Sequence, residues 1–221
     1  MSTTFEDVQS LADHVVFYMK QDWVSFQTVL KSELEGKLGI AAITSACSAI
    51  DLFSWLTTGI TVVNARWKNL LDHPNKYFGD PALFPYYLVY EVSRCGVSHQ
   101  FFPKKFLAIT AVKNKTPFFD QDGRHIINAH GFYETVLDGI TKIQGEIMAE
   151  TDPAKQQVMI DAMDVRMAAE STGCDAAIAA YPWPKIPANH FILYSNGASN
   201  TLTYPITGYP ELGGNGVVQT V

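Results

Sequence analysis

Apolar side chains recur at steps of three and four over most of the chain, the spacing that places them on one face of an α-helix. The first such segment includes Val8, Ala12 and Met19. Thr4 precedes these residues and Asp7 lies three positions after it, an arrangement typical of a helix N-terminus. The periodicity predicts helices over residues 5–35 (one long helix or two short ones), 38–56, 60–71, 86–98, 132–148 and 152–169.

The predicted helix 38–56 is apolar nearly all round, so we expect it to be the most buried. Residues 38–63 are also long enough to cross a bilayer. Asp51 near their middle would cost ~2.5–3.5 kcal/mol to insert, and Gly59 suggests a break. We therefore predict a buried helix of a soluble bundle and no membrane partner.

Turn-forming residues interrupt the helical pattern in the middle of the chain. A strand is predicted over residues 106–112, and a turn ending at Pro117 leads to Phe118. Asp122-Gly123 then forms a second turn before residues 125–128. This pattern predicts a small β-hairpin or meander inserted near residues 106–128.

The composition changes near the C-terminus, where Pro182, Pro184 and Pro187 lie close together and glycines follow. The sequence thus predicts two parts, a helical bundle over residues 1–172 and a Pro/Gly-rich extended arm over residues 173–221 with a candidate hairpin. The expected fold class is mainly α: an up-and-down helical bundle with a small β-hairpin insertion and a partly extended C-terminal arm.

The charge balance and the cysteines narrow the function classes. The 221 residues carry a net charge of −6, so the whole molecule does not favour a polyanion, and RNA would need a local basic patch. The candidates for that patch are Lys104, Lys105, Lys113 and Lys115, joined by Arg94 and Arg124. Three widely spaced cysteines without a CxxC pair indicate neither a zinc site nor a disulfide framework. With no secretory signal visible at the N-terminus, a cytoplasmic location is expected.

Two polar residues near the end of helix 86–98 need a partner or a site. Arg94 and His99 lie in an otherwise apolar stretch with four residues between them, and burying an unpaired charge costs several kcal/mol. A histidine can move a proton near neutral pH, and an arginine can brace phosphate oxygens. Metal-independent RNA cleavage needs these functions, because the ribose 2′-OH must lose a proton, the leaving 5′-oxygen must gain one and the phosphorane must be stabilised.

The stretch from Arg94 through His99 to the sequence Gln-Phe-Phe-Pro-Lys at residues 100–104 resembles the signature of the HEPN superfamily, helical-bundle proteins that include metal-independent ribonucleases. The resemblance implies a dimer with the site built across it, an RNA substrate and no cofactor. It makes Arg94 the phosphate-binding residue and His99 the proton-transfer residue. Cys95 departs from the family pattern, since active members often have a polar residue, commonly asparagine, at that position.

Geometry leaves alternatives open for this pair. On a straight α-helix the two side chains would lie ~140° apart, so they converge only if the helix ends near Gly96 or if two subunits contribute. Arg94 also has structural partners in reach, Glu91 one turn before it or Asp51, and His99 could cap the helix. We therefore keep two hypotheses: an endoribonuclease or RNA-binding relative, and a non-catalytic helical dimer that serves as a binding or regulatory module for a separate protein partner.

Other charged, aromatic and histidine side chains have expected roles of their own. Asp51 is expected to orient Arg94 or His99, with Arg94 its favoured partner. Arg66 and Lys68 on the helix 60–71 are expected to face water. The aromatic residues around Tyr90 can stack bases but are expected to be core. The last group, Asp120, Asp122, His125 and His130, lacks the spacing of a calcium loop or a helical metal pair, so no metal is expected.

Overall fold

The structure is a computed structural model that describes residues 3–29, 35–72, 77–96, 108–112, 115–121 and 123–180. The chain divides into two compact units, Met1–Ser171 and Thr172–Val221. Its helices are α1 (Phe5–Val29), α2 (Glu35–Thr58), α3 (Val63–Leu71), α5 (Ala129–Ala149) and α6 (Pro153–Ala180), with a π-helix, η1 (Tyr87–Arg94). The strands are β1 (Ala108–Thr110), β2 (Phe118–Gln121) and β3 (Arg124–Asn128). The predicted mainly-α fold with a small β insertion is confirmed.

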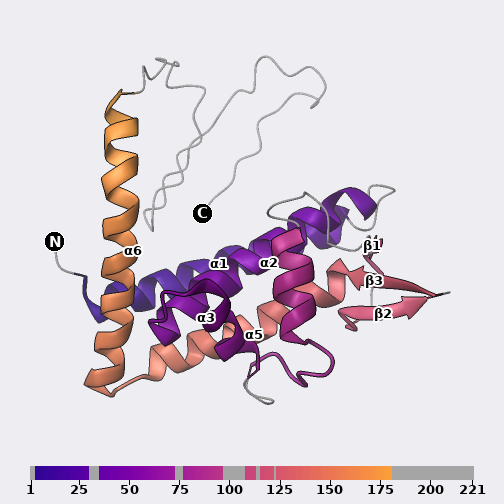
Figure 1. Ribbon diagram of the computed structural model, residues 1–221, viewed down its shortest axis with the longest axis horizontal. Helices are drawn as coiled ribbons and strands as arrows, with labels where there is room; N and C mark the ends of the chain where they lie inside the picture. The colour runs from indigo at the N-terminus through magenta and orange to yellow at the C-terminus, as the bar shows by residue number, and fades with distance from the viewer. Residues whose placement is uncertain are drawn as a thin grey trace. The chain divides into compact units, whose positions relative to one another are not determined.

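Helix α2 lies at the centre of the first unit. It packs against α1, α3, α5, η1 and β1, and Figure 1 shows α1 and α5 running beside it. Its buried side chains include Ile43, Ile50 and Phe53, none of which has any exposed surface. One face of α2 stays open, since Ala41, Thr44 and Ser48 are exposed, and its other faces bury the apolar side chains that the sequence pattern predicted.

Helix α1 is amphipathic, and its inward face follows the predicted spacing. Val8, Ala12 and Met19 are buried. The expected N-terminal capping is present, since the backbone N–H of Thr4 donates to Asp7 Oδ2 at 2.8 Å and the backbone N–H of Asp7 donates to Thr4 Oγ1 at 3.3 Å. These bonds satisfy backbone donors that the first turn leaves unpaired.

The sheet differs in topology from a meander. β2 and β3 form the predicted antiparallel hairpin around Gly123, which has a φ of 73°. β1, however, pairs with β3 in parallel, with Ile109 opposite Ile127, so the strand order is β1-β3-β2. Local turn chemistry predicts only the pairing of adjacent strands, because a parallel pair needs a longer connection that leaves no local signature.

Two features bear on the other sequence-based expectations. α6 continues through Gly173 to Ala180, past the end predicted at about residue 169, and the run of alanines after Gly173 favours this continuation.

Within α2, residues Gly39–Thr58 are long and apolar enough to cross a membrane by length and composition, yet 56% of that stretch is buried inside the protein. Core helices of water-soluble proteins pass the same test, so length and composition are weak evidence that α2 crosses a membrane.

Two glycines in α5 test how tightly its faces pack. A Cβ added at Gly139 would lie 2.4 Å from Cδ1 of Phe78, whereas one at Gly145 would meet nothing within 4 Å. Replacing glycine by alanine in a helix gains about 0.5–1 kcal/mol of backbone preference. We expect Gly145→Ala to raise the free energy of unfolding by that amount and Gly139→Ala to lower it by about 1–3 kcal/mol because of overpacking. Urea denaturation measures both, and equal stabilisation by the two variants would contradict the close packing.

Tyr133 on α5 predicts how stability depends on pH. It has no exposed surface and its hydroxyl donates to the backbone oxygen of Met19 at 3.0 Å. Burial is the main cause that raises its pKa from 10.0 to about 12. The unfolded chain therefore loses this proton at lower pH than the folded protein, so the contribution of Tyr133 is intact below about pH 10 and is lost as the pH rises towards about 12.

The measurement is the free energy of unfolding from pH 9 to 12 in the wild type and in Tyr133→Phe, with Tyr18→Phe as the control at a 46% exposed position. Tyr133→Phe is expected to flatten the alkaline decline by about 1.4 kcal/mol per pH unit of the shift, and Tyr18→Phe to leave it unchanged. An unchanged slope in Tyr133→Phe would contradict the assignment.

Candidate functional site around a buried arginine and an aromatic column

Arg66 on α3 is buried, with only 3% of its surface exposed. Its Nη2 forms a salt bridge with Asp51 Oδ1 at 2.9 Å, and its Nη1 donates to the backbone oxygen of Thr61 at 3.2 Å. Its guanidinium also lies 4.7 Å from the ring centroid of Trp55. The expectation that Arg66 faces water is therefore wrong. The carboxylate of Asp51 on α2 is the partner that offsets the free-energy cost of burying the charge of Arg66.

Asp51 also binds a second side chain of α3, that of Trp67. Its Oδ1 also accepts a hydrogen bond from the indole Nε1 of Trp67 at 2.7 Å, and Trp67 is fully buried. The ring of Trp67 in turn packs against Tyr90, with centroids 5.3 Å apart. Asp51 therefore fixes α3 on α2 through a cation and an indole, and its influence reaches η1 through Trp67.

The motif segment forms a π-helix, in which hydrogen bonds join residue i to residue i+5. The backbone N–H of Cys95 donates to the oxygen of Tyr90, and Ser93 Oγ donates to the oxygen of Leu88 at 2.7 Å. Ser93 has no exposed surface, so this hydroxyl bond meets the need of a buried polar group. π-helical turns occur frequently at functional sites.

Tyr86, Tyr90 and two cations form a continuous column on this segment. The two rings are stacked, with centroids 5.3 Å apart and planes 11° from parallel. Arg94 lies 5.6 Å from the centroid of Tyr90, and Lys68 of α3 lies 5.6 Å from that of Tyr86. We name this set, Lys68, Tyr86, Tyr90 and Arg94, the aromatic column. Cation–π contact of this kind fixes a cation without neutralising it, and of the two cations only Lys68 also forms a salt bridge within the described residues, with Asp72.

Burial affects the two tyrosines of the column. It is the largest cause that raises the pKa of Tyr90, while the charge of Arg94 acts in the opposite direction. It is also the largest cause that raises the pKa of Tyr86. Both phenols therefore stay neutral near neutral pH and present polarisable rings rather than anions to the flanking cations.

Arg94 is half-buried and forms no salt bridge to any residue that the structure describes. Its Nη1 lies 3.9 Å from Sγ of Cys95, which is a weak acceptor. The expectation that Asp51 pairs with Arg94 is wrong, because Asp51 instead binds Arg66 and Trp67. The link from Asp51 to Arg94 is indirect and passes through Trp67 and Tyr90.

The cysteines beside the column are buried thiols. Cys47 on α2 is 4% exposed and Cys95 is 9% exposed. Burial strongly raises the pKa of Cys47, although the charge of Arg94 acts to lower it. A thiol that stays protonated is a poor nucleophile and a poor metal ligand. Cys47 therefore acts as a small core residue.

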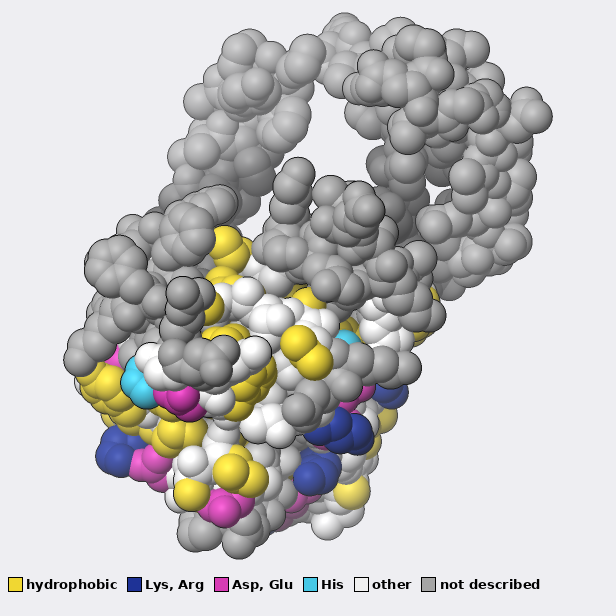
Figure 2. All heavy atoms as spheres, turned by 90° about the vertical axis from the view of Figure 1, so that its right-hand side faces the viewer, with side chains coloured by type: hydrophobic (Ala, Val, Ile, Leu, Met, Phe, Trp, Pro, Cys, Tyr) yellow, Lys and Arg dark blue, Asp and Glu magenta, His cyan; other side chains and the backbone are white. Residues whose placement is uncertain are grey.

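Several predicted site residues lie outside the part of the chain that the structure describes. These are His99, Lys104, Lys105 and Lys113. The described helix continues to Gly96, so the predicted placement of His99 relative to Arg94 lies outside the described residues. On the face shown in Figure 2, the coloured Lys and Arg side chains lie beside acidic ones and form no broad basic surface among the described residues.

The predicted acidic–histidine group divides into two places. Asp120 Oδ2 lies 3.2 Å from His125 Nδ1 across the β2–β3 hairpin, where both side chains are exposed. His130 is instead buried at the start of α5, with its ring 4.7 Å from that of Trp23 and its Nδ1 3.7 Å from Glu134 Oε2. Within the described residues, no group of three or more metal-binding side chains gathers.

Comparison with known proteins yields no relative: no family model, no curated protein and no solved structure matches the chain. The chemistry of the site must therefore be argued from its own residues. Sequence reasoning found Arg94 and Asp51 but missed Arg66 and Trp67. A signal for both was present in the sequence. Asp51 is the only acidic residue in the apolar part of α2, and it needs a polar partner; Arg66 and Trp67 on the next helix are both buried and supply one.

Replacing Asp51 tests whether this carboxylate organises the site. Asp51→Ala leaves the charge of Arg66 buried without its anion and the indole of Trp67 without its acceptor, so we expect it to lower the free energy of unfolding by about 3 kcal/mol. Asp51→Asn retains an oxygen acceptor and should cost less. The matched control is Asp138→Ala at an exposed position of α5, expected within about 0.5 kcal/mol of wild type. Equal effects of Asp51→Ala and Asp138→Ala would contradict the role of Asp51.

Proposed function

We propose that this protein is a HEPN-like protein that acts on RNA, with Arg94 as the residue that binds phosphate. The observation that carries the proposal is the state of Arg94. Its guanidinium is half-buried, rests on Tyr90 and has no carboxylate partner among the described residues. An arginine held in this way keeps its charge and its planar set of donors for an external anion, and phosphate is the anion that this geometry binds well.

The aromatic column supports a nucleic acid as the source of that phosphate. Single strands are bound where cations that contact the backbone alternate with aromatic side chains that stack on bases. Tyr87, adjacent to the column, has 57% of its surface exposed and supplies a free ring. The sequence adds Lys104, Lys105 and Lys113 as further phosphate-binding residues, which a protein of net charge −6 needs near the site.

The proposed chemistry is cleavage without a metal. His99 transfers the proton between the ribose 2′-oxygen and the leaving 5′-oxygen, and Arg94 stabilises the charge on phosphorus. On a straight α-helix Arg94 and His99 lie ~140° apart, so the proposal requires either that the helix ends near Gly96 or that two subunits contribute one residue each. Asp51 is a positioning residue that acts on Arg94 through Trp67 and Tyr90. The protein works as a cytoplasmic homodimer without a cofactor.

The test is cleavage of a mixed RNA pool in EDTA by the wild type, Arg94→Ala, Arg94→Lys and His99→Ala. Lys155→Ala, which removes an exposed cation from α6, is the charge-matched control. We expect His99→Ala to slow cleavage by about 10²–10⁴-fold, the usual contribution of a general acid or base. Arg94→Ala should slow it by a similar factor, and Arg94→Lys should restore little, because lysine lacks the planar donor set.

RNA binding and unfolding of the same variants separate the outcomes. RNA bound by wild type, lost in Arg94→Ala and never cleaved would identify an RNA-binding relative without catalysis. If neither binding nor cleavage is seen, and Arg94→Ala is markedly less stable than Lys155→Ala, the proposal fails. The non-catalytic helical dimer with a protein partner is then the function to pursue.

A further inference from the structure

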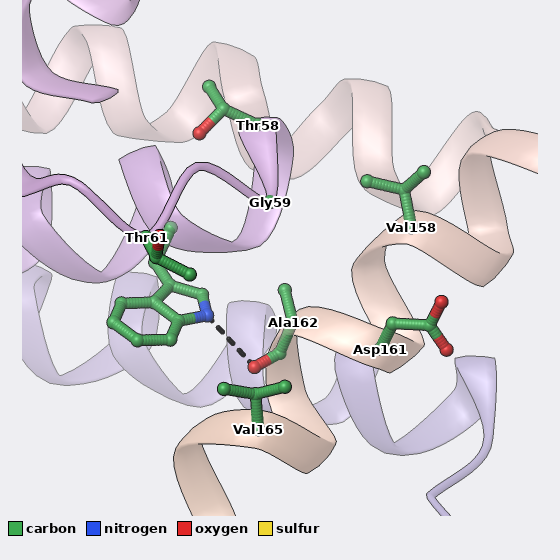
Figure 3. Close-up of a pocket in the computed structure, with 8 residues that line it drawn as sticks. Thr58, Gly59, Thr61, Val158, Asp161, Ala162 and Val165 are labelled. Atoms are coloured by element: carbon green, nitrogen blue, oxygen red, sulfur yellow. Dashed lines mark hydrogen bonds between the residues drawn. The ribbon is translucent and has the colours of Figure 1, made fainter. Parts of the chain in front are cut away.

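A separate pocket lies between the C-terminal end of α2 and the first half of α6 (Figure 3). Its volume is about 270 Å³. The α2 side consists of Trp55, Thr58 and Gly59, continued by Thr61. The α6 side is formed by Val158, Asp161, Ala162 and Val165. None of these residues belongs to the aromatic column, so the pocket is a second site.

Two contacts make the pocket a fixed feature of the fold. The indole Nε1 of Trp55 donates to the backbone oxygen of Ala162 at 2.8 Å, which ties α6 to α2. Gly59 has a φ of 62°, and a Cβ there would lie 3.2 Å from Cγ1 of Val158. Only glycine adopts this backbone conformation at low cost, so α2 ends where α6 comes near. The Trp55–Ala162 bond therefore joins the two walls, and the missing side chain of Gly59 lets them approach closely.

The charges around the pocket are negative. Helix α2 ends at Thr58 with no basic residue in its last turn, so no charged side chain of that turn offsets the partial negative charge of its C-terminus, although the hydroxyls of Thr57 and Thr58 donate to two of its carbonyls. Asp161 supplies a carboxylate from the opposite wall, and its Oδ1 accepts one hydrogen bond, from Gln157 at 2.7 Å. The nearby cation, Arg66, lies against Trp55 but is already paired with Asp51.

The apolar part of the pocket is separate from its anionic part. Figure 3 shows the carboxylate of Asp161 turned away from the backbone oxygen of Ala162, which accepts the hydrogen bond of Trp55, while Val165 points towards that oxygen. Val158 and Val165 are 44% and 52% exposed, which is unusual for valines that line a concave surface. An occupant would cover them. A ligand that fits these features has a short apolar chain for the indole and the valines, and a positive group for the carboxylate.

We propose that this pocket binds a small aliphatic ammonium compound. Its alkyl chain lies against Trp55 and the two valines, and its ammonium group lies at the edge of the pocket beside Asp161 and the C-terminal end of α2. The hydrophobic part supplies contact area, and the two negative groups select a cation over a neutral or anionic compound. Arg66 does not oppose the ligand, because its charge is neutralised by Asp51.

The experiment is a titration of the full chain with n-butylammonium, followed by the NMR signals of the tryptophan indole N–H groups. The chain has four tryptophans, and Trp55→Phe identifies the signal of Trp55. n-Butanol is the neutral probe of similar shape. Asp161→Asn removes the charge at an exposed position, and Asp138→Asn on α5 is the matched control outside the pocket.

We expect n-butylammonium to shift the Trp55 signal in a saturable way and n-butanol to bind up to about fivefold more weakly, as expected for the loss of one exposed ionic contact. Asp161→Asn should weaken the binding of n-butylammonium by a similar factor, and Asp138→Asn should leave that binding unchanged. The proposal is overturned if n-butanol binds equally well, if Asp161→Asn has no effect, or if n-butylammonium causes no saturable shift of Trp55. Far-UV circular dichroism of each variant confirms that the fold is retained.

Discussion

A single carboxylate, that of Asp51, sets the arrangement of the centre of this protein. It neutralises Arg66, accepts a hydrogen bond from Trp67 and belongs to α2, the helix that packs against α1, α3, α5, η1 and β1. The buried charge of Arg66 would be strongly destabilising without this partner. Because both partners come from α3, the polar contact specifies one position of that short helix against α2, where apolar packing alone would permit several.

The same contact links two sites that share no residue. On one side Trp67 supports Tyr90, which supports Arg94 in the aromatic column. On the other side Arg66 lies on Trp55, which forms part of the pocket beside α6. Each link is a contact between large, rigid side chains in a close-packed interior, where small displacements are transmitted rather than absorbed. A ligand in either site therefore meets a surface whose position depends on Asp51.

The sequence was sufficient for the parts of the fold that local pattern determines. The face of α1 built from Val8, Ala12 and Met19, the capping pair Thr4–Asp7 and the apolar helix α2 all follow from spacing and residue type. The parallel pairing of β1 with β3 does not, since nothing near Ile109 indicates a partner so far along the chain. Arg66 was misplaced for a related reason: a charged residue on a short helix normally faces water, and only contact with Asp51, fifteen residues earlier, reverses this. In the candidate site, residue chemistry pointed to Arg94, but the π-helical form of residues 87–94 was not predicted, because the apolar spacing fits an α-helix as well.

That geometry makes the chain length of the motif segment critical. A π-helical turn contains more residues than an α-helical turn, so loss of a single residue between Tyr87 and Tyr90 would allow η1 to relax into an ordinary α-helix. Everything after the deletion would rotate by about 100° relative to Tyr86 and move back along the axis by about 1.5 Å. Tyr90 and Arg94 both follow the deletion, so they would turn together and Tyr90 would lose its stack on Tyr86. A shortened segment of normal composition would then fold into the same bundle with the column broken between its two rings.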